Sequence, residues 1–488
     1  MKFLVTLFLL VGSMNLIAQN DYELVEKTVS KDIIKSHIYF LASDELKGRQ
    51  TGSHEGNVAA LYLANQLKKY GVQPISGAEK GYFQPVMIRK TTAPTSFSLT
   101  INGSTSDKLL IIKGANINRQ AEMVFLNHGE EKDYEGVDVK GKWVLVRAGL
   151  SEEDNARSSI MQGRTKRKVA KEMGALGLIE ISLEDDKTWR SLGFYFNRSK
   201  TVMGEQDDFV HCWVQHASAD FLEIAHSGQS LGATLSITGI VNSELPSQNV
   251  VGMVEGTDSL LKDEFIIYSA HYDHVGTGKP DNLQDSVFNG ARDNAVGTVT
   301  VLSMAENLAK YPTKRSALFI LFTGEEMGLL GSQYYVDHPL LPLEDMVFCF
   351  NSDNGGYNDK SLATIIGLTR TTAERNIVDA AKMAGLRAIE DPAPEQNLFD
   401  RSDNVHFAVK GIPAPTYSLG FRAFDAEINR FYHQRTDQAD NLDYDYLHKF
   451  FLSYVYSGRK IANDPETPFW VKGDKYYEAG LKLYGREK

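Results

Sequence analysis

The chain has 488 residues, of which 42% are apolar and 24% are charged, a balance typical of folded globular proteins and not of disordered or fibrous ones. This length is too great for one ordinary hydrophobic core, so we expect two domains. The chain is acidic, with 63 Asp and Glu against 52 Lys and Arg, which argues against a role in binding nucleic acid.

The first residues have the pattern of an export signal. Lys2 precedes the apolar run FLVTLFLLVG, and small residues follow as far as Ala18. Because this run is short for a bilayer, we expect residues 1–19 to be a signal peptide that directs the chain to the periplasm or the extracellular space. No later stretch reaches the roughly 18 apolar residues of a spanning helix, so no membrane span is expected in the mature chain.

The segment after the signal is predicted to be helical from Asp32 to Gly71. Its apolar residues Ala60, Leu63, Ala64 and Leu67 recur at the spacing of one helical face, and Gly71 supplies a stop.

Residues 93–245 have a different sequence pattern, with short segments that are typical of β-strands, such as SFSLTI, LLIIKG and KWVLVRAG. We expect this segment to be a separate insert domain, with residues 20–92 and 246–466 forming one discontinuous domain and 467–488 a tail. The only cysteines, Cys212 and Cys349, are not expected to pair, because Cys349 lies in the apolar run MVFCF, where a small buried side chain is typical.

From Asn249 onward, strand-like and helix-like patterns alternate, which predicts a parallel-rich sheet covered by helices. The expected strands are EFIIYSA, SALFILFT, MVFCFN and APTYSL, and helices are expected to begin after Asp293, after Gly328 and near Thr372.

The strand FIIYS is followed by AHYDHVG, in which His271 and Asp273 are two residues apart. In a strand such residues face the same side, which suits a metal-binding histidine with a carboxylate behind it. By the same alternation His274 faces away, and we expect no role for it. Taken alone, this motif could equally be a surface cluster.

Five more acidic or histidine residues, in four motifs, follow expected strands or precede a helix, and each motif has an ordinary structural explanation. Asp293 could cap a helix, Glu325 with Glu326 could form an exposed turn, Asp353 could form a turn, and His433 could be a surface residue. Together with His271, however, they form a mixed nitrogen and oxygen set suited to two zinc ions about 3.5–4 Å apart.

The order of AHYDHVG, NGARDNAVG, FTGEEMGLLGS, NSDNGG and YHQRTD resembles the two-zinc aminopeptidase family, which also contains glutamate carboxypeptidases and glutaminyl cyclases. Segments LASDELKGRQTGS and RSDNVHFAVKGIPAP are also similar to that family. The insert looks like a protease-associated domain, on the strength of DYEGVDVKGKWVLVRAG and EMGALGLIEI. The resemblance implies a three-layer α/β/α zinc-exopeptidase fold with a mostly parallel mixed sheet, plus the β-rich insert.

The resemblance also implies a role for each matched residue. His271 and Asp353 would bind one zinc ion, Glu326 and His433 the other, and Asp293 would bridge both. Three further residues would support the chemistry: Asp273 would orient His271, Glu325 would be the general base, and Tyr432 would donate a hydrogen bond to the developing oxyanion.

The expected activity is therefore removal of amino-terminal residues from peptides. Three alternatives stay open from the sequence. One is a carboxypeptidase for acidic residues, for which the added charge of Arg292 is the only hint. The second is a glutaminyl-cyclase-like acyltransferase. The third is a receptor of this fold without enzymatic activity, but the presence of all five expected ligands argues against it. The sequence leaves the oligomeric state undecided, and the insert could restrict substrate access or mediate dimerisation.

Overall fold

The computed structural model describes residues 21–78, 81–151, 154–203, 208–216, 221–226 and 231–486. The expected signal peptide at residues 1–19 lies outside this range. No described helix has the length and apolar character needed to cross a membrane. The chain divides into two compact units, the first comprising Met1–Ile88 with Leu245–Lys488 and the second Arg89–Glu244.

The first unit is built on a mixed sheet with the strand order β16-β15-β17-β14-β12-β13-β11-β1. β12 runs parallel to both β13 and β14, while β11 is antiparallel to β13 and β15 is antiparallel to β17. Every residue of β13 and β14 is buried, which explains why these strands read as unbroken apolar runs. The strands are β1 (Phe83–Thr91), β11 (Asn242–Val254), β12 (Phe265–His271), β13 (Ser316–Phe322), β14 (Met346–Ser352), β15 (Leu362–Ile366), β16 (Arg387–Ile389) and β17 (Thr416–Leu419).

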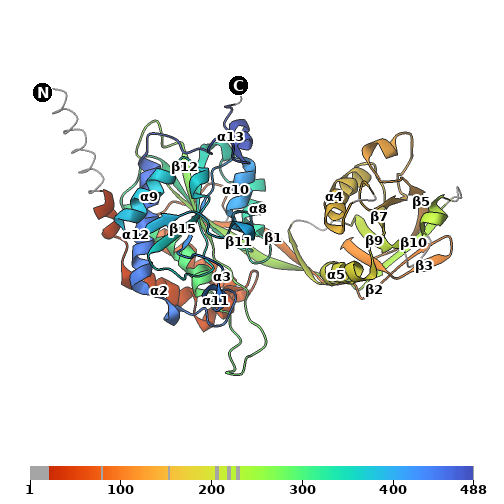
Figure 1. Cartoon of the computed structure of the whole chain (residues 1–488), viewed down its shortest axis with the longest axis horizontal. Coiled ribbons are helices and arrows are strands. Elements are labelled where there is room, and N and C mark those ends of the chain that lie inside the picture. The colour runs from red at the N-terminus through yellow and green to blue at the C-terminus, as the bar shows by residue number, and fades with distance from the viewer. Residues whose placement is uncertain are drawn as a thin grey trace. The chain divides into compact units, whose positions relative to one another are not determined.

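Helices cover both faces of this sheet (Figure 1). One face carries α2 (Lys31–Leu41), α3 (His54–Tyr70), α7 (Gly297–Lys310), α9 (Glu374–Met383) and α12 (Tyr444–Asn463). The other face carries α8 (Leu330–Asp337), α10 (Asn404–Lys410) and α13 (Tyr477–Leu483). The expected three-layer α/β/α arrangement with a mostly parallel mixed sheet is confirmed.

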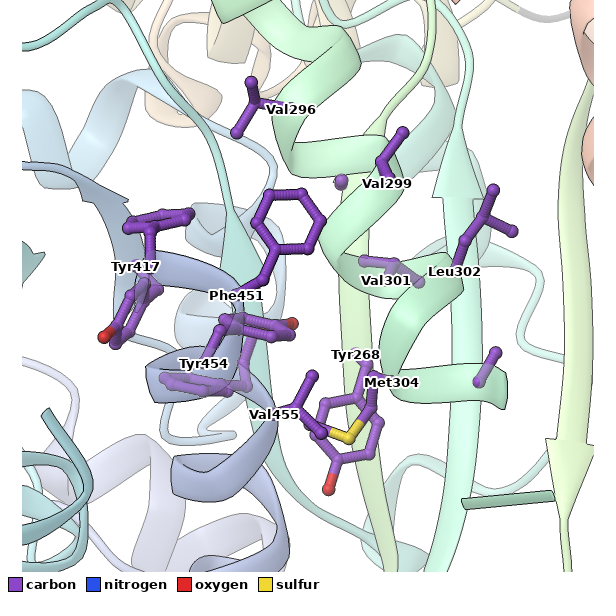
Figure 2. Close-up of a cluster of buried hydrophobic side chains, with 14 of the residues drawn as sticks. Tyr268, Val296, Val299, Val301, Leu302, Met304, Tyr417, Phe451, Tyr454 and Val455 are labelled. Carbon is purple, nitrogen blue, oxygen red and sulfur yellow. The ribbon is translucent and has the colours of Figure 1, made fainter. Parts of the chain in front are cut away.

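The core on the α7 face is packed tightly enough to need a glycine. Figure 2 shows Leu302 of α7, Tyr268 of β12 and Tyr454 of α12 in one buried cluster. A Cβ atom at Gly458 of α12 would lie 2.6 Å from Cε1 of the buried Tyr268 ring on β12. Glycine at this position therefore lets α12 approach the sheet.

The last residues belong to the first unit and not to a separate tail. Trp470 is 1% exposed and packs in the core cluster on the α10 face, where its indole N–H donates a 2.9 Å hydrogen bond to the Gly411 carbonyl. Helix α13 packs against the same cluster through Tyr477 and Leu483.

The second unit contains a sheet with the strand order β3-β2-β10-β5-β6-β7-β9-β4. Its middle strands β5, β6, β7 and β9 are parallel neighbours. The strands of this segment are β2 (Ser96–Ile101), β3 (Ser104–Ser106), β4 (Leu109–Lys113), β5 (Ile117–Phe125), β6 (Trp143–Arg147), β7 (Gly177–Ser182), β8 (Lys200–Met203), β9 (Val210–Gln215) and β10 (Leu231–Thr238), and the helices are α4 (Ala156–Glu172), α5 (Asp186–Phe196) and α6 (Phe221–His226). Cys212 in this unit and Cys349 in the first unit are both buried and free, as expected.

Candidate metal centre

Three neighbouring strands deliver acidic and histidine side chains to one edge of the sheet. β12 ends at His271, β13 is followed by Glu325 and Glu326, and β14 is followed directly by Asp353. Because β12 is parallel to β13 on one side and to β14 on the other, the carboxyl ends of these strands meet. The structure thus brings these four predicted residues to the same place.

Two further residues come from loops. Asp293 lies in the turn η4 (Ala291–Val296) before α7, and it does not cap that helix, whose N-cap residue is Val296. His433 follows α11 (Ala426–Asn429) and has a left-handed backbone with φ of 54°. Such strained conformations in residues other than glycine gather at functional sites. The ordinary explanations of a helix cap and a surface histidine therefore do not describe these two residues.

The first group of donor atoms surrounds His271. Its Nε2 atom lies 3.2 Å from Oδ1 of Asp353 and 3.5 Å from Oδ1 of Asp293. These three residues form a set in which each can offer one donor atom to a shared cation.

The second group surrounds His433. Its Nε2 atom lies 3.1 Å from Oδ2 of Asp293 and 3.2 Å from Oε2 of Glu326. Asp293 therefore takes part in both groups, with Oδ1 facing His271 and Oδ2 facing His433. This is the arrangement that a carboxylate bridging two ions requires.

The spacing of the donor atoms fits zinc. Ligand atoms at about 2.0–2.1 Å from a tetrahedral zinc ion are separated by roughly 3.3 Å. The four spacings within the two groups, from 3.1 to 3.5 Å, agree with that value. The first group provides three protein donors, and the second provides Asp293, Glu326 and His433, with His274 as a fourth possible donor. Catalytic zinc sites use three protein donors and keep a fourth position open for water or substrate.

The negative charge of the clustered carboxylates also favours the binding of cations. Burial disfavours a charged His271, yet the carboxylates of Glu325 and Asp353 outweigh burial and raise its pKa well above the ordinary value. Burial likewise opposes charge on His433, and hydrogen bonds to Asp293 and Glu326 raise its pKa to about 10. The site thus attracts protons strongly, and metal ions can take their place, since metal binding needs the neutral imidazole.

Asp273 supports the cluster from behind. Its carboxylate accepts hydrogen bonds from the hydroxyl of Thr51 at 2.6 Å and from the backbone N–H of Glu325 at 3.2 Å. Nδ1 of His271 lies 3.2 Å from the Asp273 carbonyl oxygen and 3.7 Å from its carboxylate. The residue therefore holds both the histidine and the turn that carries the two glutamates.

A hollow with an empty volume of about 650 Å³ lies next to the donor groups. Glu325 and Tyr432 line it together with His271, Asp293 and Asp353. Burial raises the pKa of Glu325 well above its usual range, against the opposing charge of His271. Burial also raises the pKa of Tyr432, so its hydroxyl stays protonated and able to donate. The rest of the wall is mixed, with the apolar residues Ile366, Leu398, Phe421, Phe424 and Ile428 beside polar ones that include Asn354, Arg401, Ser402, Thr416 and Ser418.

His274 contacts the cluster, contrary to the expectation from the sequence. Its Nδ1 atom lies 2.8 Å from Oε1 of Glu326, and the residue is only 1% exposed. The strand alternation that pointed His274 away holds only as far as His271, where β12 ends. Beyond His271 the chain turns, so the alternation of a strand does not apply to His274. The prediction that His274 faces away from the cluster was therefore wrong.

A buried arginine clamps the loops that carry the site. Arg49 is 1% exposed, and its guanidinium donates hydrogen bonds to the backbone carbonyls of Tyr272 at 2.8 Å, Asn289 at 2.6 Å and Gly290 at 3.0 Å. The fixed fork of the guanidinium allows one side chain to join several carbonyls. Arg49 thereby ties the loop after β12 to the loop before Asp293.

Arg292 is a structural residue and does not bring charge to the hollow. It is 2% exposed, and its Nη1 atom lies 3.0 Å from Oδ1 of Asp437. The same carboxylate accepts hydrogen bonds from the backbone N–H groups of Arg292 and Asp293. This pair holds the backbone at Arg292 and Asp293. Arg292 therefore no longer hints at an acidic substrate.

A mixed sheet with two groups of nitrogen and oxygen donors at its carboxyl edge defines a candidate metal centre. Residues 249–456 match the model of peptidase family M28. This finding confirms the resemblance to the two-zinc aminopeptidases.

The chain is similar to proteins that are named as aminopeptidases. Aminopeptidase YwaD of Bacillus subtilis is 27% identical over 243 residues, which make up 49% of this chain and 50% of that protein. The match thus spans half the length of that relative. The probable leucine aminopeptidase 2 of Aspergillus fumigatus is 25% identical over 415 residues, covering 80% of this chain and 74% of the relative. The solved structure of an aminopeptidase from Aneurinibacillus sp. strain AM-1 has a TM-score of 0.51 at 22% identity, covers 91% of this chain and 97% of its own, and supports the fold.

Proposed function

We propose that the chain is a zinc-dependent aminopeptidase that releases amino-terminal residues from peptides. The observation that carries the proposal is the pair of donor groups that share Asp293, with spacings of 3.1–3.5 Å, beside the carboxylate of Glu325. The names of the similar proteins support the same activity.

The donor groups would hold two zinc ions, His271 and Asp353 binding one, Glu326 and His433 the other, and Asp293 both. Ions bound there supply Lewis acidity, which polarises a peptide carbonyl and makes water easier to deprotonate.

Glu325 would act as the general base. Its carboxylate lines the hollow and belongs to neither donor group. It can therefore take a proton from the attacking water and later deliver it to the leaving amine.

Tyr432 would stabilise the negative charge that develops on the carbonyl oxygen. Its ring stacks on the ring of His433 with centroids 4.1 Å apart, which fixes its position at the edge of the hollow. In the described part of the chain no hydrogen bond involves the Tyr432 hydroxyl, so this donor is free for substrate. A well-placed donor of this kind contributes roughly 3–4 kcal/mol to transition-state stabilisation.

The walls of the hollow favour an apolar first residue in the substrate. Ile366, Leu398, Phe421 and Phe424 offer apolar surface to a side chain. The carboxylates of the cluster provide negative charge for the protonated amino group of a peptide, which supports cleavage from the amino terminus.

Blocked peptides test the direction of cleavage. A leucine-initiated peptide with a free amino terminus and an amidated carboxyl terminus should be shortened from its amino end by the zinc-loaded protein. The same peptide with an acetylated amino terminus should stay intact, because the amino group can no longer occupy the site. Products are identified by mass spectrometry, and cleavage of the acetylated peptide from its carboxyl end would refute the aminopeptidase assignment.

A carboxypeptidase for acidic residues is a second candidate function. The residue that supports it is Arg401 and no longer Arg292. Arg401 lines the hollow and is the only Lys or Arg among the residues that do so. Within the described residues its guanidinium makes no hydrogen bond or ion pair, so it could bind a substrate carboxylate. An acetylated peptide ending in glutamate, added to the assay above, distinguishes this activity.

We further propose that the chain is exported and that the second unit is a protease-associated insert. The amino-terminal pattern supports export, and the motif DYEGVDVKGKWVLVRAG supports the identity of the insert. Export predicts that the mature protein begins near residue 20. The mass of the protein recovered from the medium or the periplasm checks this, and an intact amino terminus would contradict it.

A further inference from the structure

We propose that His274 is a positioning residue, which holds Glu326 by a hydrogen bond and thereby sets the affinity of the metal position formed with His433. This inference rests on the proposed function, because it assumes that Glu326 binds a metal ion. It adds to the five expected ligands a residue whose task is to orient one of them.

His274 belongs to the second donor set, but its distance to Glu326 is that of a hydrogen bond. Nδ1 of His274 and Oε1 of Glu326 are 2.8 Å apart, within the usual 2.7–2.9 Å of a charge-assisted hydrogen bond. Two ligands of one tetrahedral zinc ion should be about 3.3 Å apart. The other contacts of this group, at 3.1 Å from His433 to Asp293 and 3.2 Å from His433 to Glu326, have that wider spacing.

The two oxygen atoms of Glu326 are thus used differently. Oε2 faces His433, whereas Oε1 faces His274. Since an ionised carboxylate only accepts hydrogen bonds, Nδ1 of His274 must carry the proton and donate it. A hydrogen bond to one oxygen fixes the rotation of the carboxylate and directs the other oxygen to the metal position. Residues that orient ligands in this way commonly contribute a factor of about 10–100 to metal affinity.

His274 is itself held rigidly enough for this task. It is 1% exposed, and its backbone N–H donates to the carbonyl of Arg49, the residue that clamps the neighbouring loops. Gly290 lies directly against its ring, because a Cβ atom there would come within 2.6 Å of Cγ and Cδ2 of His274. The glycine before the Asp293 turn therefore leaves room for the imidazole.

Zinc affinity measured by competition with a chromogenic chelator tests the proposal. His274→Ala should weaken the binding of one of the two zinc ions by about 10–100-fold and leave the other unchanged. His274→Asn keeps a donor near the position of Nδ1 and should restore most of the affinity. The matched control is His37→Ala, which removes another buried histidine of the first unit, hydrogen-bonded to Tyr62 at 2.6 Å and away from the site.

Rescue by His274→Asn separates orientation from general damage to the fold, because asparagine restores the donor and not the imidazole ring. Unchanged affinity in His274→Ala, or an equal loss of affinity in His274→Ala and His274→Asn, would overturn the inference. If the wild-type protein bound no zinc at all, the proposed function itself would fail, an outcome distinguishable from either of these.

Discussion

Replacing Glu325 with alanine is expected to lower kcat for peptide hydrolysis by roughly 10²–10⁴-fold and to leave the zinc content unchanged. The reason is that the Glu325 carboxylate lines the hollow beside His271 and Asp353 but belongs to neither donor group. Its removal takes away the proton acceptor and spares the ligands. The measurement is kcat on a peptide with a free amino terminus, together with the number of zinc ions bound per chain.

Two further variants sharpen this test. Glu325→Gln keeps the shape of the side chain but cannot accept a proton, so it should be as inactive as the alanine variant. Glu306→Gln is the control, since Glu306 pairs with Lys310 of the same helix, α7, at 2.6 Å and should not affect turnover. Activity close to that of the wild type in either Glu325 variant would remove this residue from its role.

The strands and the residues at their ends are readable from the sequence because they depend on local pattern. Unbroken apolar runs predict strands buried on both faces, as β13 and β14 are. Parallel strands then place their carboxyl ends at one edge, so polar residues that directly follow such runs converge. Local pattern is therefore sufficient to predict that His271, Glu325, Glu326 and Asp353 lie together.

The residues that hold the site could not be identified in this way, because their partners are far apart in the sequence. Arg49 binds carbonyl groups more than 200 residues away, and Asp437 is 145 residues from Arg292. Nothing in the local sequence of Arg49 indicates that its guanidinium is buried. The contact of His274 with Glu326 was missed for a different reason, since it depends on where β12 ends, and element boundaries are the least reliable part of a sequence-based prediction.

Replacing Asp293 with alanine should have a still larger effect, the loss of zinc at both positions and of all measurable peptidase activity. Asp293 is the only residue that takes part in both donor groups of the described chain, with Oδ1 at 3.5 Å from His271 and Oδ2 at 3.1 Å from His433. Without Asp293, the first group keeps His271 and Asp353, and of the expected ligands the second keeps Glu326 and His433. Two ligands are fewer than the three that catalytic zinc sites use.

A comparison of the zinc content of three variants tests the bridging role of Asp293. Asp353→Ala and His433→Ala each remove a donor from one group, so each should retain about one zinc ion per chain where the wild type binds about two. Asp293→Ala should retain none. If Asp293→Ala kept one ion, its carboxylate would serve a single position, and the two groups would be independent. If the wild type bound only one ion, the glutaminyl-cyclase-like alternative with one working zinc would be favoured over the aminopeptidase.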